Sequence, residues 1–330
     1  MNRTSLPAGS GSPQLGARAA RTVMTVTGPV DADSIGFTLP HEHTYCQLWM
    51  AHHRFDFPNQ LEDDAIFADE LGAFRDQGGT CLVDLTLPEI GRRPDKLREL
   101  SEATGVSIVM GCGWYRQGYF LPEARLEKRP VADLADELIA EIQGGVGDTG
   151  IRPGVIGEIG AEKGWVTPTE ERVHRAAGRA QRATGLPLAT HGVMSPVALE
   201  QLTILEAEGA DLGRVAVGHC DSHPYLEFHL RLVERGVFLM FDNIGQLRVG
   251  QHEQRIISLL RELIDRGHED RLLLSHDTCK IPQLRFHGGP GYAYLGEVFL
   301  PKLRAAGIPE RTIETITRDN PRRWLSLPAQ

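Results

Sequence analysis

The sequence is poor in aromatic residues and has neither a cluster of positive charge nor a long apolar run. Phe, Trp and Tyr make up 6% of its 330 residues, and 44 Asp and Glu against 35 Lys and Arg give a formal net charge of -9. Nucleic-acid-binding surfaces require clustered Lys and Arg. No segment reaches the roughly 20 apolar residues of a membrane span. We therefore expect neither a nucleic acid nor a membrane among the partners.

Cysteine is scarce and shows no pairing pattern. The chain has five cysteines, an odd number, and no CxxC motif. Free thiols are typical of a reducing compartment. The first residues are rich in Gly, Ser, Ala and Pro and lack an apolar stretch of secretory length. We interpret residues 1–23 as a disordered leader and predict that the protein is cytoplasmic.

The GxGxxG and P-loop motifs of open nucleotide-binding sheets are absent as well. Instead, apolar β-like runs alternate about eight times with amphipathic segments of helical length. A hairpin is expected over residues 25–39, and the next strand leads into His41. The other predicted strands cover residues 79–87, 106–113, 154–160, 185–191, 214–219, 236–242 and 271–277. This alternation predicts an α/β fold, a single (β/α)8 TIM barrel over residues 24–330 with a short N-terminal β-hairpin.

Side chains that commonly bind metals recur along the predicted strands. His41 and His43 point to one side of the first strand because side chains alternate, and Glu42 points to the other. Later strands carry four more such residues at or near their ends, namely Glu158, His191, His219 and Asp277. Barrels of this class place their chemistry at the C-terminal ends of the strands. The order and spacing therefore indicate a two-metal hydrolase site.

These motifs resemble the phosphotriesterase family of the amidohydrolase superfamily. The segments GFTLPHEH, DTGIRPGVIGEIG, GHCD and TRDNPRRWLS carry the resemblance over essentially the whole chain after the leader. The best-known members bridge their metals with a carbamylated lysine, whereas Glu158 resembles the phosphotriesterase-related and phosphotriesterase homology subgroup. The resemblance implies a buried metal on His41, His43 and Asp277, a more exposed metal on His191 and His219, and Glu158 as the bridge. It also implies a homodimer.

The two divalent ions are expected to be Zn, although Mn, Co or Fe would also fit these ligands. A hydroxide bridging them would attack a lactone or a carboxylic ester, with Asp277 as the catalytic proton acceptor. Phosphotriesterase activity would be a promiscuous side reaction. The alternative is an amidase that acts on a small N-acyl amino or sulfonic acid. A metal-stabilised binding protein without turnover is a third class.

Four further residues are candidate substrate contacts, namely Tyr115, Asn243, Lys280 and Arg285. Tyr115 either hydrogen-bonds a substrate oxygen or packs at the barrel mouth. Asn243 stands at a position where the similar, organophosphate-degrading members of the family carry a histidine. Phosphotriester hydrolysis is therefore not expected to be the main activity. Lys280 and Arg285 belong either to a solvated loop or to a site for an acidic group. The expected substrate is a small molecule, anionic in the second case.

The remaining polar residues are interpreted as solvated or off the ligand register. Glu42 and Glu162 are in the second class. The histidines interpreted as solvated are His52, His53, His174, His229, His252 and His268.

Overall fold

The computed structural model describes residues 21–48, 61–246 and 251–328. An eight-stranded parallel sheet in the order β10-β9-β8-β7-β6-β5-β4-β3 lies at its centre, each strand paired with the next in sequence. The strands are β3 (Phe37–Glu42), β4 (Gly79–Asp84), β5 (Ser107–Cys112), β6 (Val155–Gly160), β7 (Leu188–His191), β8 (Val215–Val217), β9 (Phe238–Phe241) and β10 (Leu272–Leu274). The predicted α/β barrel is confirmed.

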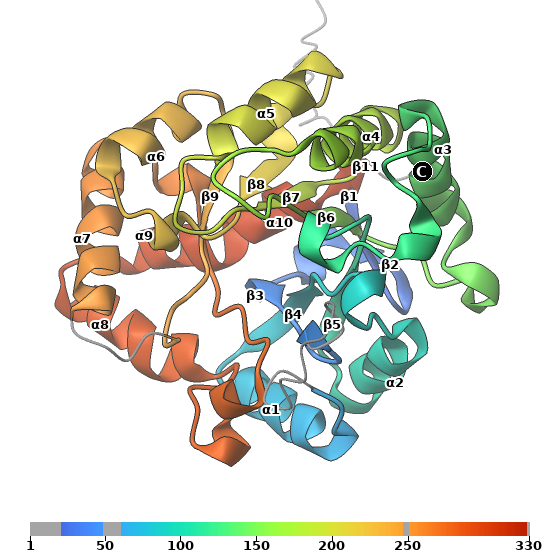
Figure 1. The fold of residues 1–330 in the computed structure, drawn as a ribbon. Helices are drawn as coiled ribbons and strands as arrows, with labels where there is room; N and C mark the ends of the chain where they lie inside the picture. Colours follow the sequence, from blue (N-terminus) through green and yellow to red (C-terminus); the bar gives the residue numbers. More distant parts are fainter. Residues whose placement is uncertain (1–20, 49–60, 247–250, 329–330) are drawn as a thin grey trace, which may run out of the picture.

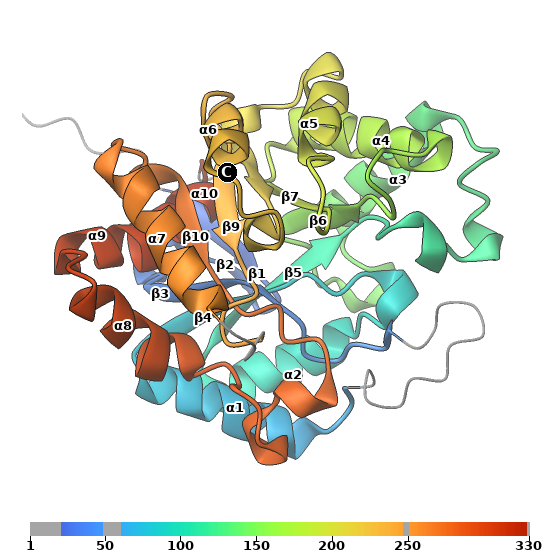
Figure 2. The ribbon, with the colours of Figure 1, turned by 60° about the vertical axis from the view of Figure 1, so that its left-hand side comes forward.

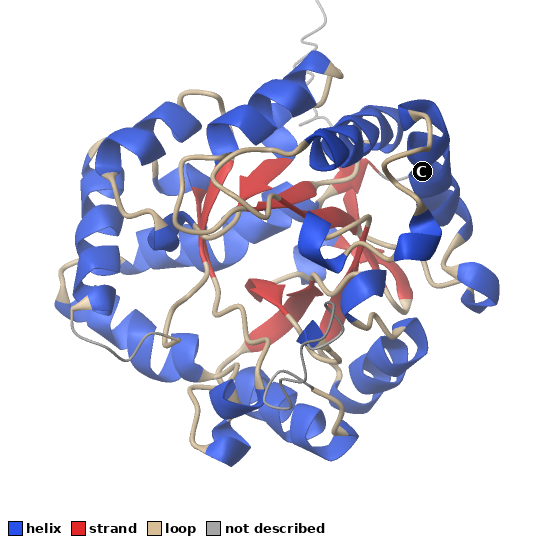
Figure 3. Cartoon of the chain, viewed as in Figure 1, coloured by secondary structure: helices blue, strands red, loops and turns tan. Residues whose placement is uncertain are grey.

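Helices surround these strands in both directions of view (Figures 1 and 2), and the strands are enclosed by them in Figure 3. They are α1 (Asp64–Asp76), α2 (Pro94–Thr104), α3 (Val131–Gly144), α4 (Pro168–Thr184), α5 (Ala198–Ala207), α6 (Leu226–Val233), α7 (His252–Asp265), α8 (Leu300–Ala305), α9 (Glu310–Glu314) and α10 (Asn320–Leu325). Local signals set their limits. In α4, Thr167 and Glu170 form a capping box, and Gly185 ends the helix at a φ of 72°.

Two apolar layers follow from strand alternation. Side chains that point outward from the strands pack against the helices in the larger layer. Inward-pointing side chains, among them Val83, Val109 and Leu273, fill the barrel interior. Trp324 of α10 belongs to this interior group and donates from Nε1 to the carbonyl of Arg214, which directly precedes β8 (3.2 Å). Trp324 therefore closes the end of the barrel at which the strands begin.

Side chains join the first and last strands of the barrel. Glu42, the last residue of β3, is fully buried. Its carboxylate accepts hydrogen bonds from the Ser275 hydroxyl (2.8 Å) and from the backbone N–H groups of His276 (2.8 Å) and Thr278 (2.9 Å). These three residues follow β10, so one carboxylate fastens the two strands together. Glu42 faces away from the ligand side of β3, as predicted.

An N-terminal hairpin is confirmed, but it covers residues 21–31 and not the predicted 25–39, because residues 37–39 belong to β3. Strand β1 (Arg21–Thr25) pairs antiparallel with β2 (Gly28–Asp31), and the C-terminal β11 (Leu327–Pro328) pairs with the other edge of β1. The sequence did not indicate this third strand. The predicted leader extended to residue 23, whereas β1 begins at Arg21, and residues 1–20 lie outside the described part of the chain.

Close approach explains one glycine beneath this hairpin. A Cβ on Gly154 would lie 2.2 Å from the carbonyl oxygen of Met24. Separately, none of the helices in the described ranges has both the length and the apolar composition needed to cross a membrane.

Replacing Trp324 with Ala is expected to lower the free energy of unfolding by about 3–5 kcal/mol, because a fully buried aromatic side chain leaves a cavity. Denaturant unfolding would measure the change. Phe286→Ala is the matched control, because Phe286 is 73% exposed and should change stability by no more than about 0.5 kcal/mol. A Trp324→Ala protein as stable as the wild type would contradict the role given to Trp324.

Candidate metal centre

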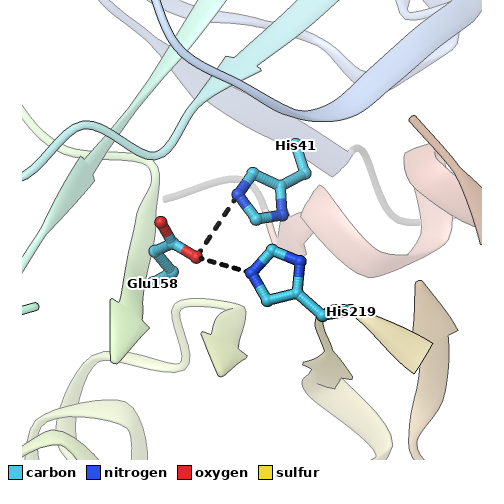
Figure 4. A group of neighbouring side chains, drawn as sticks. All are labelled: His41, Glu158 and His219. Carbon is cyan, nitrogen blue, oxygen red and sulfur yellow. Dashed lines mark ion pairs between the residues drawn. The ribbon is translucent and has the colours of Figure 1, made fainter. Parts of the chain in front are cut away.

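The structure brings all six predicted metal-ligand residues together at the C-terminal end of the barrel. His41, Glu158 and His191 lie within β3, β6 and β7, while His43, His219 and Asp277 follow β3, β8 and β10. All but Asp277 are buried. Figure 4 shows the rings of His41 and His219 turned toward the carboxylate of Glu158. Residues far apart in sequence thus form one compact polar cluster inside an apolar barrel.

Glu158 occupies the middle of this cluster. Its Oε2 lies 2.8 Å from His191 Nδ1, 3.3 Å from His41 Nε2 and 3.5 Å from His219 Nε2. Its Oε1 lies 3.5 Å from His43 Nε2. One carboxylate therefore faces four imidazoles, the position expected of a bridging group.

Asp277 faces the two histidines of β3 from the other side. Its Oδ1 lies 3.1 Å from His43 Nε2 and 3.7 Å from His41 Nε2, and its side chain is 18% exposed. Its backbone N–H donates to the carbonyl of His41 (3.1 Å). Asp277 and His219 have φ values of 54° and 56°, a left-handed conformation that non-glycine residues adopt rarely and mainly at functional sites.

Asp242 orients two of the imidazoles and was missed by the sequence analysis. It directly follows β9 and is fully buried. Its Oδ2 lies 2.7 Å from His41 Nδ1 and its Oδ1 lies 2.9 Å from His219 Nδ1. The signal was present in GVFLMFD, whose last residue ends an apolar strand as Asp277 does. Accepting both Nδ1–H groups directs the Nε2 atoms of His41 and His219 inward.

Charge governs the pKa values in this cluster. Burial lowers the pKa of His41, but the carboxylates of Glu158 and Asp242 outweigh burial and raise it well above its usual value. Burial also lowers the pKa of His219, but Asp242 outweighs burial and raises this pKa well above its usual value. Burial raises the pKa of Glu158, yet the imidazoles of His191 and His41 hold it well below the usual range. The Glu158 carboxylate is therefore ionised and attracts positive charge.

The residues fit a metal ion. His41 Nε2 is buried and has no hydrogen-bond partner in the described parts of the chain. Its other nitrogen is held by Asp242, an arrangement common around metal-binding histidines. A metal ion that displaced the Nε2 proton would take its place beside the Glu158 and Asp277 carboxylates. Two overlapping groups of side chains have ligand atoms close enough to hold an ion. They are His41 with His43 and Asp277, and His41 with Glu158 and His219.

Two of the predicted substrate contacts lie next to the cluster. The Tyr115 hydroxyl is 3.5 Å from both ring nitrogens of His191, and the two rings pack edge to face with centroids 4.8 Å apart. Asn243 is half-buried behind His219. Its side-chain amide donates to Asp221 (2.8 Å) and Asp242 (3.3 Å), so its donors are engaged by protein carboxylates.

The other two predicted contacts do not join the cluster. Arg285 pairs with Glu297 (3.1 Å), and its backbone N–H binds Glu70. It lines a groove of about 610 Å³ along α1. Lys280 is exposed, and its backbone N–H donates to Gln283 (2.7 Å). The loop that carries Arg285 folds outward against α1. The short sequence distance between these residues and Asp277 did not reveal this.

Two histidines interpreted as solvated are buried, so that prediction was wrong for them. His174 Nδ1 donates to the Glu170 carbonyl (2.8 Å), and its Nε2 accepts from Gln201 Nε2 (3.0 Å). His229 Nε2 donates to the carbonyl of Cys220 (2.8 Å). Both lie on the buried faces of amphipathic helices, α4 and α6. His52 and His53 lie outside the described residues.

Comparison with known proteins identifies a family model and several relatives. A sequence model of the phosphotriesterase family matches residues 21–325. The phosphotriesterase homology protein of Escherichia coli (strain K12) is 36% identical over 289 residues, covering 88% of this chain and 97% of that protein. The human N-acetyltaurine hydrolase is 31% identical over 350 residues, covering 92% of this chain and 98% of the relative.

Solved structures agree. The phosphotriesterase homology protein of Escherichia coli, complexed with phosphate in its active site, superposes with a TM-score of 0.84 at 33% identity, covering 89% of this chain and 99% of that chain. A lactonase from Listeria monocytogenes gives a TM-score of 0.87 at 26% identity, covering 94% of this chain and 100% of that one.

Replacing Asp242 with Asn is expected to weaken metal binding about 10- to 100-fold, because Asn is uncharged and has one acceptor oxygen for the two Nδ1–H groups of His41 and His219. Bound metal per chain, measured after dialysis against graded chelator, checks this. Asp211→Asn is the control, since exposed Asp211 only caps a turn through Gly213 (2.9 Å). An Asp242→Asn protein that keeps its metal as the wild type does would contradict the assignment.

Proposed function

The chain belongs to the phosphotriesterase family and is a hydrolase, and from this premise we propose that it uses two divalent metal ions, expected to be Zn, to hydrolyse a lactone or a carboxylic ester. One observation carries the proposal. Glu158 faces four imidazoles at distances of 2.8 to 3.5 Å, which is the arrangement that a carboxylate shared by two ions requires.

The proposed ligands divide around Glu158. His41, His43 and Asp277 would hold the ion nearer β3, and His191 and His219 would hold the other. When bound, such ions polarise a carbonyl oxygen and lower the pKa of water, so that a nucleophile is available near neutral pH. Asp242 would keep the Nε2 atoms of His41 and His219 in place throughout the cycle.

Asp277 is the proposed catalytic base. It combines contact with the cluster, at 3.1 Å from His43, with an 18% exposed side chain, so one edge of its carboxylate faces the barrel mouth. In the proposed reaction it takes a proton from the attacking water and passes it to the leaving oxygen. The Tyr115 hydroxyl, beside His191, would donate a hydrogen bond to the substrate oxygen as negative charge develops there.

Hydrolysis of an amide is the second candidate. It is favoured by the 31% identity to the human N-acetyltaurine hydrolase over 92% of this chain. An amine leaving group must be protonated before it departs, so an amidase would depend on proton delivery by Asp277 more than an esterase would. The substrate would be a small N-acyl amino or sulfonic acid. Phosphotriester hydrolysis is proposed only as a side reaction.

We also propose a homodimer in a reducing compartment such as the cytoplasm. The five cysteines are all free and buried, which supports the compartment. The dimer rests on the family resemblance.

Elemental analysis is expected to find two divalent ions per chain, and removing them with a chelator should abolish hydrolysis until a divalent ion is restored. The same sample would be assayed on a lactone, an aryl carboxylic ester, an N-acyl sulfonic acid and an aryl phosphotriester. Preference for the lactone or ester supports the first candidate, and preference for the N-acyl acid supports the second. Hydrolysis that persists without metal would sink both.

Asp277→Asn is expected to lower kcat by about 10²- to 10⁴-fold, the range for losing a general base. Metal content is measured on the same protein, so that loss of chemistry is separated from loss of the ions. Asp270→Asn serves as control because the Asp270 side chain is 51% exposed on the outer surface. Unchanged kcat in Asp277→Asn with its metal retained would remove Asp277 from the mechanism.

A further inference from the structure

Arg116 lies near the metal centre, in the loop that follows β5. Arg116 directly follows Tyr115, and its side chain is 21% exposed. The guanidinium carbon lies 5.2 Å from the ring centroid of Tyr115 and 4.8 Å from that of Tyr119. Cation–π contact with two aromatic rings, which are tilted by 56° to each other, holds the guanidinium beside Tyr115. Its Nε is buried and has no hydrogen-bond partner in the described parts of the chain.

The neighbouring loop holds Arg116 in place. Glu162, in the loop after β6, accepts from Arg116 Nη1 (2.6 Å) and from the backbone N–H of Gly118 (3.3 Å). Glu170 of α4 then ties the two loops together, accepting from the N–H groups of Gln117 (3.1 Å) and Glu162 (2.7 Å). Two carboxylates therefore fix the backbone that directly follows this arginine.

Gly160, at the end of β6, allows the two loops to meet. A Cβ at this position would lie 2.8 Å from the Tyr115 carbonyl oxygen and 2.9 Å from Arg116 Cβ. The Gly160 N–H donates to that same carbonyl (2.7 Å). The backbone that carries Arg116 is thus built directly onto the strand that carries Glu158.

Tyr115 connects the arginine to the centre. Its hydroxyl lies 3.5 Å from the nitrogens of His191, and its ring centroid lies 5.2 Å from the Arg116 guanidinium carbon. Arg116 is therefore one side chain away from a proposed metal ligand. Arg285, the cation predicted in the last loop, instead lines the groove along α1 and does not reach the cluster.

We propose that Arg116 binds an acidic group of the substrate, a carboxylate or a sulfonate, and so makes the site selective for acyl compounds that carry one. The inference rests on the proposed function, because it places the scissile carbonyl at the metal centre. Glu162 occupies one donor of the guanidinium and orients it. The exposed part of the Arg116 side chain would meet the acid, while Tyr115, beside His191, would lie between that group and the reacting carbonyl.

The competing explanation is that Arg116 only positions Tyr115. Selectivity between matched substrates separates the two roles. A binding role affects a charged substrate and spares its neutral analogue, whereas a positioning role affects both equally. The probes are para-acetoxybenzoate, which carries a carboxylate, and para-acetoxybenzamide, which has nearly the same shape without the charge.

Arg116→Met is expected to lower kcat/KM for para-acetoxybenzoate about 10- to 100-fold, the loss for one charge-assisted hydrogen bond, and to change the benzamide by less than about threefold. Arg116→Lys should recover part of the loss. Arg235→Met is the matched control, since Arg235 forms a 2.7 Å pair with Glu206 and is 22% exposed, outside the site. Glu162→Gln should strengthen the preference for the benzoate, because it removes a competing carboxylate.

Equal losses on both substrates, or a Glu162→Gln protein that loses preference for the benzoate, would overturn the inference. Calorimetric binding of para-hydroxybenzoate and para-hydroxybenzamide to the metal-loaded proteins provides a readout without turnover. If the wild type hydrolyses neither ester, the proposed function fails, and binding alone decides the role of Arg116. Benzoate binding that is equally strong in wild type and Arg116→Met would then show the inference to be wrong.

Discussion

The carboxylate of Glu42 closes the barrel, and the metal centre depends on that closure. Strands β3 and β10 are the ends of the sheet, and Glu42 accepts from Ser275, His276 and Thr278 across the seam. Burial raises the pKa of Glu42, but His276 and the surrounding donors outweigh it and lower the pKa. The ionised carboxylate thereby holds the chain on both sides of Asp277, which brings Asp277 to 3.1 Å from His43.

A second buried carboxylate, that of Asp242, fixes the orientation of two imidazoles, as Glu42 fixes the position of the backbone. Asp242 binds Nδ1 of both His41 and His219, so a single residue after β9 orients side chains from β3 and β8. Burying ionised groups in an apolar barrel is costly unless each is paired. The cluster meets this requirement because imidazoles surround Glu158 and Asp242. His41 Nε2 has no hydrogen-bond partner in the described residues, and a metal ion could bind there.

Much of the fold was predictable because its signals are local. Apolar runs that alternate with amphipathic segments identified the barrel strands and several helices, and strand alternation separated His41 and His43 from Glu42. The prediction was wrong where distant segments determine the outcome. The pairing of β11 with β1 joins the two ends of the described chain. His174 and His229 lie on amphipathic helices, and the packing of these helices against neighbouring segments shows that both side chains are buried.

The sequence by itself determined the barrel and the side chains that gather at its mouth, because ligand residues at the C-terminal ends of parallel strands must converge when the sheet closes. Tertiary structure alone decided which other groups reach them. It placed Asp242 behind two imidazoles and Arg116 against Tyr115, and it directed Arg285 outward to Glu297. Loop direction depends on contacts between segments far apart in sequence, and these contacts leave no periodic pattern in the chain.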